Sequence, residues 1–238
     1  EKMGADYQVD LHSYHCDETL FLELLEKHKH NYKYYVIVPH FRSKTLLYKS
    51  TTDKAIQAIN KLPKKNLVIL DNKDSKIEGS FIQVYQDFEE DIVNALTSEK
   101  EKITKYNSLT LVYPKSTFYP YPRKIANGFK KYCTQNNFKF EIIDEVLPET
   151  VIENKTLFIT IEESDLVSIM HKARKSKLTL GKDIGVISYN DTPLKQLLGI
   201  SVLSSDLRAM GEKAATMIKE NKKEKVKSPF SFIQRASL

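Results

Sequence analysis

Glycine, cysteine and tryptophan are scarce in this sequence of 238 residues, which contains seven Gly, two Cys and no Trp. So few glycines argue against a phosphate-cradling loop, and the motifs GxGxxG, GxxxxGK(S/T), GxSxG and HExxH are absent. Cys16 and Cys133 lie far apart without a CxxC pair, so we expect no disulfide framework and a reducing compartment. No stretch approaches the roughly 18 apolar residues of a membrane span, and the first residues do not resemble a signal peptide. We therefore expect a cytoplasmic protein that does not enter a membrane.

The nearest approach to a metal site is the stretch HSYHC, which holds His12, His15 and Cys16. On a strand, residues 12 and 15 point to opposite faces, so joint ligation would require a distorted backbone. Zinc ligation is therefore the weaker interpretation, and polar side chains at a strand end are the stronger one. We expect neither a metal nor a cofactor.

Two pairs of adjacent acids, Glu89-Glu90 and Glu162-Glu163, could supply acid/base chemistry. Each pair stands near the expected start of a helix, where carboxylates stabilise the helix dipole, and we favour that structural role. No other set of side chains argues for catalysis, so we expect a protein that is not an enzyme.

The charge balance does not decide the function. The formal net charge is +6, with 41% hydrophobic and 29% charged residues, which is ordinary globular composition. The one dense basic run, residues 219–227, also carries Glu220 and Glu224. We interpret it as a solvated connector, with a nucleic-acid contact as the alternative.

Apolar runs of strand length alternate with segments of helical period. Strands are expected at 7–14, 34–40, 66–72, 80–87, 109–114, 138–144, 156–161 and 184–191. Helices are expected at 16–30, 51–62, 88–103, 122–137 and 164–177. This alternation predicts an α/β fold with parallel sheets and right-handed crossovers.

The pattern pauses near residues 104–108 and begins again, which predicts two Rossmann-like lobes. We expect an N-terminal lobe of residues 1–105, to which 199–222 return. The C-terminal lobe would comprise 106–198 and a final strand at 228–238. The opening EKMGADYQV is typical of the end of a helix running into a strand, so we expect a first strand and most of a helix to be missing upstream.

Ligands of open α/β sheets sit beyond the carboxyl ends of the strands. Polyols need acceptors for vicinal hydroxyls, donors such as Arg, and an aromatic face for their C–H side. The expected strand ends offer all three kinds of group. Our candidate ligand-binding residues are Asp87, Asn190, Asp191, Arg123, His40, Phe41, Tyr85 and Tyr119. Their convergence predicts a small-ligand cleft.

The stretch GKDIGVISYNDTPLKQLLGISVLSSDLRAMGEKAATMIKE, followed by SPFSFIQRASL, resembles the carboxyl-terminal half of the lactose-repressor (LacI/GalR) family. The elements that carry the resemblance are Tyr189-Asn190-Asp191, Ser205-Asp206, Met210-Gly211 and Arg235-Ala236-Ser237. One branch of this family is more similar still, on three segments: the chain's end, VPHF and YPYPRKIANGF. In that branch the effector domain follows a GntR-type winged helix, in proteins that regulate the use of sugars such as fucose.

The resemblance implies a fold of the type I periplasmic-binding-protein class and roles for particular residues. Asn190 lies where relatives use an Asp against ligand hydroxyls, and Asp87 matches the acid that ends a first-lobe strand. Leu207 stands where some relatives place a ring, so stacking would come from Phe41 or Tyr119. Arg123 lies five residues before Gly128, whereas many relatives have a sugar-contacting Arg three before.

The implied function is effector sensing by a dimerising domain of a transcriptional regulator. The effector would be a monosaccharide, such as a deoxy-sugar or pentose, or its phosphate, bound between the lobes. DNA would be bound through an upstream domain of a longer polypeptide. The segments crossing between the lobes are expected near 105–108, 192–199 and 226–229. The alternatives are a stand-alone solute receptor of a transport system and an α/β enzyme acting on a sugar or nucleoside.

Overall fold

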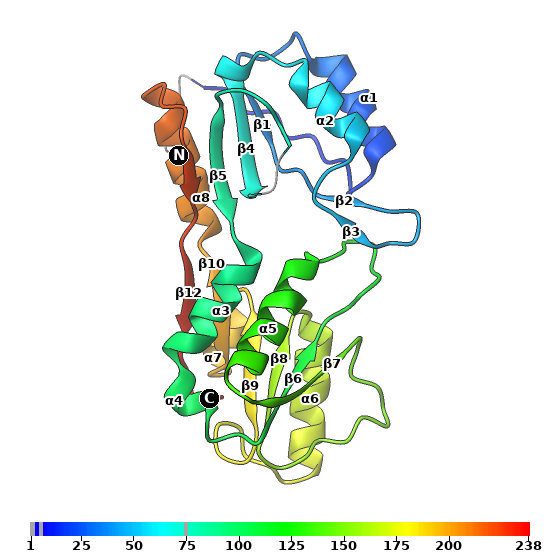
Figure 1. The fold of residues 1–238 in the computed structure, drawn as a ribbon, viewed down its shortest axis with the longest axis vertical. Coiled ribbons are helices and arrows are strands. Elements are labelled where there is room, and N and C mark those ends of the chain that lie inside the picture. Colours follow the sequence, from blue (N-terminus) through cyan, green and yellow to red (C-terminus); the bar gives the residue numbers. More distant parts are fainter. Residues whose placement is uncertain (1–2, 5–6, 74–75) are drawn as a thin grey trace. The chain divides into compact units, whose positions relative to one another are not determined.

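A computed structural model describes residues 3–4, 7–73 and 76–238 of the chain (Figure 1). The described chain forms two compact units. Unit 1 contains the residues up to Asp87, the segment Ser116–Pro122 and the segment Asp206–Pro229. Unit 2 contains Phe88–Lys115, Arg123–Ser205 and Phe230–Leu238.

Unit 1 is built on a parallel sheet with strand order β1-β4-β5-β11. The strands are β1 (Tyr35–Ile37), β4 (Leu67–Asn72), β5 (Ile82–Gln86) and β11 (Lys225–Lys227). A separate antiparallel hairpin follows β1 and joins β2 (Phe41–Arg42) to β3 (Tyr48–Lys49). The helices are α1 (Glu18–His28), α2 (Asp53–Asn60), the 3-10 turn η1 (Lys64–Asn66) and α8 (Leu207–Lys219).

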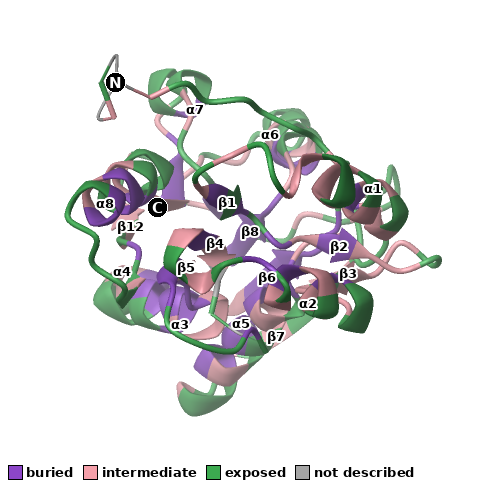
Figure 2. Cartoon of the chain, turned by 90° about the horizontal axis from the view of Figure 1, so that it is seen from above, coloured by how far each residue is buried: buried purple, intermediate pink, exposed green. Residues whose placement is uncertain are grey.

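Successive side chains along a strand point to opposite faces of this sheet, and each face packs into a separate hydrophobic core. Leu67 and Ile69 face a cluster that includes Phe21 of α1 and Ile59 of α2. Val68 faces a second cluster, formed with α8. Figure 2 shows α8 on the opposite side of β1, β4 and β5 from α1 and α2. Helices α1, α2 and α8 are capped by the side chains of Asp17, Thr52 and Asp206, respectively.

Unit 2 is built on a sheet of order β12-β10-β9-β8-β6-β7, in which only the β10–β12 pair is antiparallel. The strands are β6 (Ser108–Val112), β7 (Lys139–Ile143), β8 (Thr156–Thr160), β9 (Gly185–Tyr189), β10 (Ser201–Ser205) and β12 (Phe230–Ile233). The helices are α3 (Phe88–Ser98), α4 (Lys100–Ile103), α5 (Arg123–Gln135), α6 (Glu163–Lys175) and α7 (Pro193–Leu197).

Helices α3 and α5 approach each other unusually closely at Gly128. A Cβ atom on Gly128 would lie 2.4 Å from Cγ2 of Ile92 and 2.5 Å from the carbonyl oxygen of Glu89. Only glycine leaves room for backbone at this distance. This contact attaches α3 to unit 2.

The α/β fold with two parallel-sheet lobes is confirmed, but the expected boundaries are displaced. Residues 88–105 were expected in the first lobe, whereas α3 and α4 belong to unit 2 because α3 packs on α5. Residues 199–205 were also expected in the first lobe, but β10 is a strand of the unit 2 sheet. The chain passes between the units at 87–88, 115–116, 122–123, 205–206 and 229–230. Of the expected crossing segments, only 226–229 lies beside one of these.

One expected strand is wrong. Residues 7–14 have the strand pattern but form no ladder, because no neighbouring strand in the described chain pairs with them. Val9 is 78% exposed and Leu11 is 93% exposed. Each of the other expected strands overlaps an observed strand.

Candidate functional site

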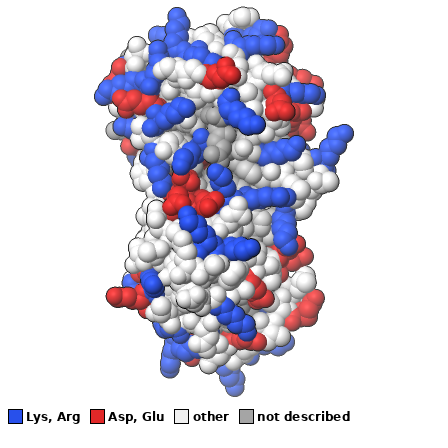
Figure 3. Space-filling model, viewed as in Figure 1, with Lys and Arg blue, Asp and Glu red and all other residues white. Residues whose placement is uncertain are grey.

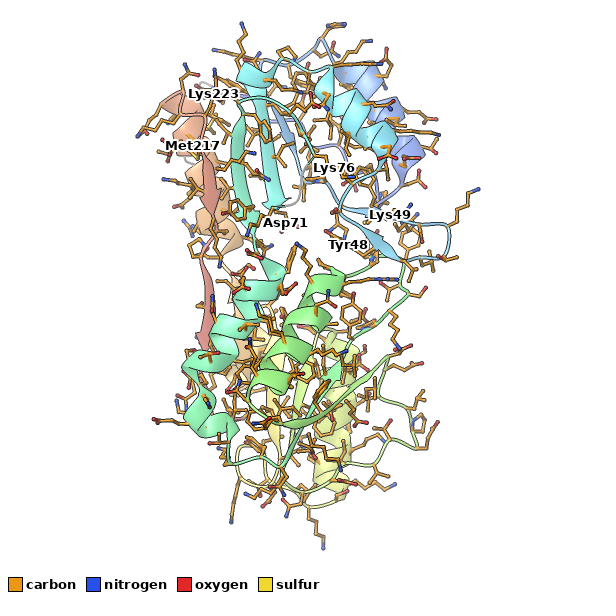
Figure 4. The ribbon with its side chains drawn as sticks, viewed as in Figure 1. Tyr48, Lys49, Asp71, Lys76, Met217 and Lys223 are labelled. Carbon is orange, nitrogen blue, oxygen red and sulfur yellow. The ribbon has the colours of Figure 1, made fainter. Side chains whose placement is uncertain are left out.

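Polar side chains gather at the carboxyl edge of the unit 1 sheet. Asp71 lies near the end of β4 with a left-handed φ of 76° and accepts a hydrogen bond from Nε2 of Gln86, at the end of β5 (Figure 4). Burial raises the pKa of the Asp71 carboxyl, and the bond from Gln86 offsets part of that shift. Asp87 follows β5 and forms an ion pair with Lys73, whose Nζ lies 5.9 Å from the ring centroid of Tyr85.

His40 lies at the same edge, just after β1. Its backbone N–H donates to the hydroxyl of Tyr14 over 2.8 Å, and its ring packs edge-on against Tyr48 of β3, with centroids 4.7 Å apart. The electrostatic interaction with His40 acts to lower the pKa of Asp71. Unit 1 therefore brings His40, Tyr85 and Asp87 together with Asp71.

Residues 116–122, which we call the strap, are packed on unit 1 although β6 and α5 on either side belong to unit 2. Nε2 of His40 lies 2.7 Å from the carbonyl oxygen of Pro120, and Nδ1 of His15 lies 3.0 Å from the hydroxyl of Tyr119. The guanidinium of Arg42 donates to the carbonyl oxygen of Phe118 over 3.2 Å and lies 3.8 Å from that ring's centroid. The strap thus presents Tyr119, 53% exposed, beside His40.

The carboxyl end of β9 forms the corresponding edge of unit 2. Asn190 has a left-handed φ of 60°, donates its backbone N–H to the carbonyl oxygen of Leu203 over 2.7 Å, and exposes its side chain. Arg123 is the first residue of α5 and is also exposed; α5 follows the carboxyl end of β6 in the same sheet. Asn190 and Arg123 are two of the exposed polar groups at this edge.

Asp191 was expected to bind ligand but is engaged within the protein. Nη1 of Arg235 donates to Oδ1 of Asp191 over 2.8 Å, and Nη2 donates to Oδ2 over 2.7 Å. This bidentate pair lowers the pKa of Asp191, mainly through the hydrogen bonds from Arg235. Both carboxylate oxygens accept from one guanidinium, so in this structure Asp191 holds Arg235 and does not present an unpaired carboxylate.

Phe41 was expected as a stacking surface and is instead part of the unit 1 core. Its side chain is 0% exposed and packs edge-on against Phe21, with centroids 5.2 Å apart. A buried ring has no face to offer a sugar. Tyr119 is the candidate that remains accessible.

Asp71 and Lys73 were missed as site residues. The signal was present, because LDNKD spans the end of a buried strand, just as Asp87 stands at the end of the next one. The two histidines of the HSYHC stretch have different partners and do not form a joint site. The ring of His12 stacks on His28 with centroids 4.3 Å apart, whereas His15 contacts Tyr119. In the part of the chain that the structure describes, no group of three or more His, Cys, Asp or Glu is placed to hold a metal ion.

Basic residues do not form a single patch on the face seen in Figure 3, where lysines and arginines are interspersed with acids. The acid pairs stand at helix starts: Glu89 and Glu90 lie in the first turn of α3, and Glu162 is the N-cap of α6. Among the described helices, none has the length and apolar character needed to cross a bilayer.

No protein-family model matches the chain, and no curated protein matches it by sequence. Among solved structures, the chain is similar to a LacI-family transcriptional regulator from Lactobacillus casei with bound glucose. The TM-score is 0.68 and the identity 12%, over 100% of this chain and 92% of that one. It is also similar to a periplasmic binding protein/LacI transcriptional regulator from Alkaliphilus metalliredigens complexed with D-xylulofuranose (TM-score 0.60, 12% identity, 93% and 84% covered).

A third similar structure is a regulatory protein of the LacI family from Chloroflexus aggregans, at a TM-score of 0.65 and 16% identity, over 95% of this chain and 83% of that one. At these identities the likeness concerns the fold. The two Rossmann-like lobes of this chain have the fold of the periplasmic-binding-protein-like domains of LacI-family regulators.

Proposed function

We propose that this chain is the effector-sensing domain of a transcriptional regulator and that its effector is a small sugar. The observation that carries the proposal is the set of polar side chains at the carboxyl edge of each sheet. Asp71 and Asp87 are the acceptors in unit 1, and Asn190 is the exposed amide in unit 2. Carboxylates accept hydrogen bonds from hydroxyls, and an amide both donates and accepts. Two solved structures of this fold hold a sugar, which supports the same ligand class here.

The effector class that fits best is a monosaccharide, including pentoses and deoxy-sugars, or a sugar phosphate. Tyr119 offers an aromatic face to the C–H side of a sugar ring. Lys73 and Arg123 are the cations that would meet a phosphate.

Regulation requires differential affinity of the effector for two states of the protein. DNA binding through a further domain, and a GntR-type winged helix as that domain, stay predictions, as does a cytoplasmic location.

The proposal is tested by thermal unfolding of the chain in the presence of pentoses, hexoses, deoxy-sugars and their phosphates. A ligand of the native state at 100 times its dissociation constant adds about 2.7 kcal/mol to the unfolding free energy. We expect one sugar class to stabilise the chain, and the effect to disappear in Asp87→Asn and Asn190→Ala.

Asn137→Ala is the matched control for Asn190→Ala. Asn137 also has a left-handed backbone, with φ of 56°, and lies just after the end of α5. Both variants should lose similar stability, since alanine tolerates this conformation less well than asparagine. Only Asn190→Ala should lose the response to the sugar. A response that survives in Asp87→Asn and Asn190→Ala would contradict the assigned site.

We further propose that the chain forms a homodimer through α7 and the adjoining part of α6. Leu194, Leu197 and Leu198 in or beside α7 are 53%, 82% and 40% exposed, and Val167 on α6 is 46% exposed. The ammonium of Lys195 on α7 lies 3.6 Å from Oε1 of Glu163 in the first turn of α6, so the two helices adjoin. Apolar side chains gathered on adjoining helices are typical of an interaction surface.

Leu197→Glu is expected to convert the dimer to a monomer, because a dimer would bury the new carboxylate without a partner. Sedimentation velocity across a range of protein concentrations measures the change. The control is Leu147→Glu, at a leucine that is 41% exposed outside this surface. A wild-type chain that sediments as a monomer at all concentrations would overturn the dimer.

A further inference from the structure

A lysine without an assigned role is buried beneath the candidate site of unit 2. Lys195 of α7 is 2% exposed. Its ammonium donates to the carbonyl oxygen of Tyr189 over 2.7 Å and to that of Asn190 over 3.0 Å. The nearby carboxylate, Oε1 of Glu163, lies 3.6 Å away on a side chain that is 54% exposed. The closest partners of this cation are therefore two backbone carbonyls at the end of β9.

Burying this ammonium is costly. Desolvation lowers the pKa of Lys195, and the charge of Glu163 offsets only part of that shift. An apolar side chain of similar volume would fill the same space without removing a charge from water. What the lysine adds over an apolar side chain is a pair of hydrogen bonds to the backbone on both sides of the Tyr189–Asn190 peptide.

The backbone at this position is strained and held from several directions. Asn190 has a φ of 60°. Its N–H is bonded to Leu203, its carbonyl oxygen to Lys195, and the next N–H, of Asp191, donates to Oγ of Ser204 over 3.2 Å. Arg235 then fixes the Asp191 carboxylate. The Asn190 side chain is left exposed as the polar group that this tip presents.

We propose that Lys195 is a positioning residue of the effector site, which locks the left-handed tip of β9 so that the Asn190 amide faces a hydroxyl-rich ligand. The identity of the ligand rests on the proposed function, whereas the geometry of Lys195 and Asn190 does not. Lys195 does not contact the ligand. It acts through the two carbonyls, and without it Asn190 relaxes towards conformations that ordinary residues prefer.

The first test needs no ligand. Protein labelled with nitrogen-15 only at asparagine gives a backbone amide signal for Asn190 in NMR spectra. In Lys195→Met we expect this signal to shift and broaden, because a tip that exchanges between conformations on the microsecond-to-millisecond timescale broadens its resonances. The matched control is Glu163→Gln, which weakens the ion pair but leaves both carbonyl bonds, and its Asn190 signal should be unchanged. An unchanged signal in Lys195→Met would overturn the proposal.

The second test restores the ammonium chemically. Lys195→Cys, made together with Cys16→Ser and Cys133→Ala, is treated with 2-bromoethylamine while unfolded and then refolded, which produces S-aminoethylcysteine with an ammonium at the reach of lysine. The Asn190 signal should be perturbed before the treatment and return to the wild-type position after it. The comparison of Lys195→Cys before and after aminoethylation also tests the positioning role if Lys195→Met does not fold. Recovery of folding without recovery of the Asn190 signal would reduce Lys195 to a packing role.

The third readout is affinity for the sugar that stabilises the wild-type chain in the thermal panel. We expect Lys195→Met to weaken that affinity about tenfold, the size of one well-formed hydrogen bond to the ligand. The aminoethylated protein should recover it, and Glu163→Gln should retain it. If no sugar in the panel stabilises the wild-type chain, the proposed function fails, while the NMR comparison still decides whether Lys195 positions Asn190.

Discussion

Phe41→Ala is expected to lower the unfolding free energy by about 3–5 kcal/mol, the range for removing a fully buried phenylalanine ring. The ring of Phe41 lies in the core of unit 1, edge-on to Phe21 and 5.2 Å from the ring centroid of Tyr14. The substitution leaves a cavity in the cluster that α1, α2 and the unit 1 sheet form together, where the backbone cannot close without losing other contacts. Denaturation in urea, followed by far-ultraviolet circular dichroism, measures the loss.

Tyr119→Ala is the comparison that separates core from ligand contact. Tyr119 is half exposed and has one side-chain bond, to His15, so about 1 kcal/mol is the expected loss of stability. Its effect should instead appear in the affinity for the sugar. If Phe41→Ala kept the stability of the wild type and lost the ligand, Phe41 would be the stacking surface after all, and the core described for unit 1 would be incorrect.

Gly128→Ala is expected to destabilise unit 2 by about 1–3 kcal/mol or more, the cost of forcing an extra methyl group into a packed interior. The new Cβ would meet the backbone of α3 at the carbonyl of Glu89, and backbone cannot move aside as the end of a flexible side chain can. Helices α3 and α5 would have to separate. Differential scanning calorimetry should record a lower transition temperature, by about 2–4 °C for each kcal/mol in a chain of this size.

Gly211→Ala is the matched control, because it makes the same change within another helix. Nothing lies within 4 Å of a Cβ built on Gly211 in α8. Alanine there should raise stability by about 0.5–1 kcal/mol, since glycine loses more conformational freedom in a helix interior. Equal shifts of the same sign in the two variants would show that the α3–α5 contact is looser than the structure has it.

The helices of this chain were predictable from their periodic apolar positions, and the buried strands from short continuous apolar runs. The exceptions have identifiable causes. The stretch 7–14 has the alternation of a strand, but pairing needs a neighbour, which a local pattern cannot supply. The expected boundary near residue 106 followed the pause in the pattern. The actual division places α3 with α5, a helix distant in sequence, and their close approach at Gly128 is not visible in a local pattern.

The site was predictable at the level of strand ends but not of individual side chains. Asp87 and Asn190 are where the strand-end rule puts them. Asp191 follows the same rule, yet Arg235, from the far end of the chain, occupies its carboxylate. Lys195 looks like an ordinary surface lysine of a short helix, and only the fold of that helix over the end of β9 buries it.

Because residues 7–14 pair with no strand of the described chain, we expect any self-association of this protein to proceed by strand pairing at this stretch. Val9 and Leu11 of this stretch expose their side chains, and among the described strands β1 is the outermost of its sheet, with Val36 and Val38 half exposed. Unpaired strand backbone with apolar side chains is a template for intermolecular pairing. Asp10 and His12 alternate with the apolar residues, and polar side chains placed in this way oppose such growth. The colloidal behaviour of the protein at high concentration then depends on a few polar side chains at one edge, more than on its net charge of +6.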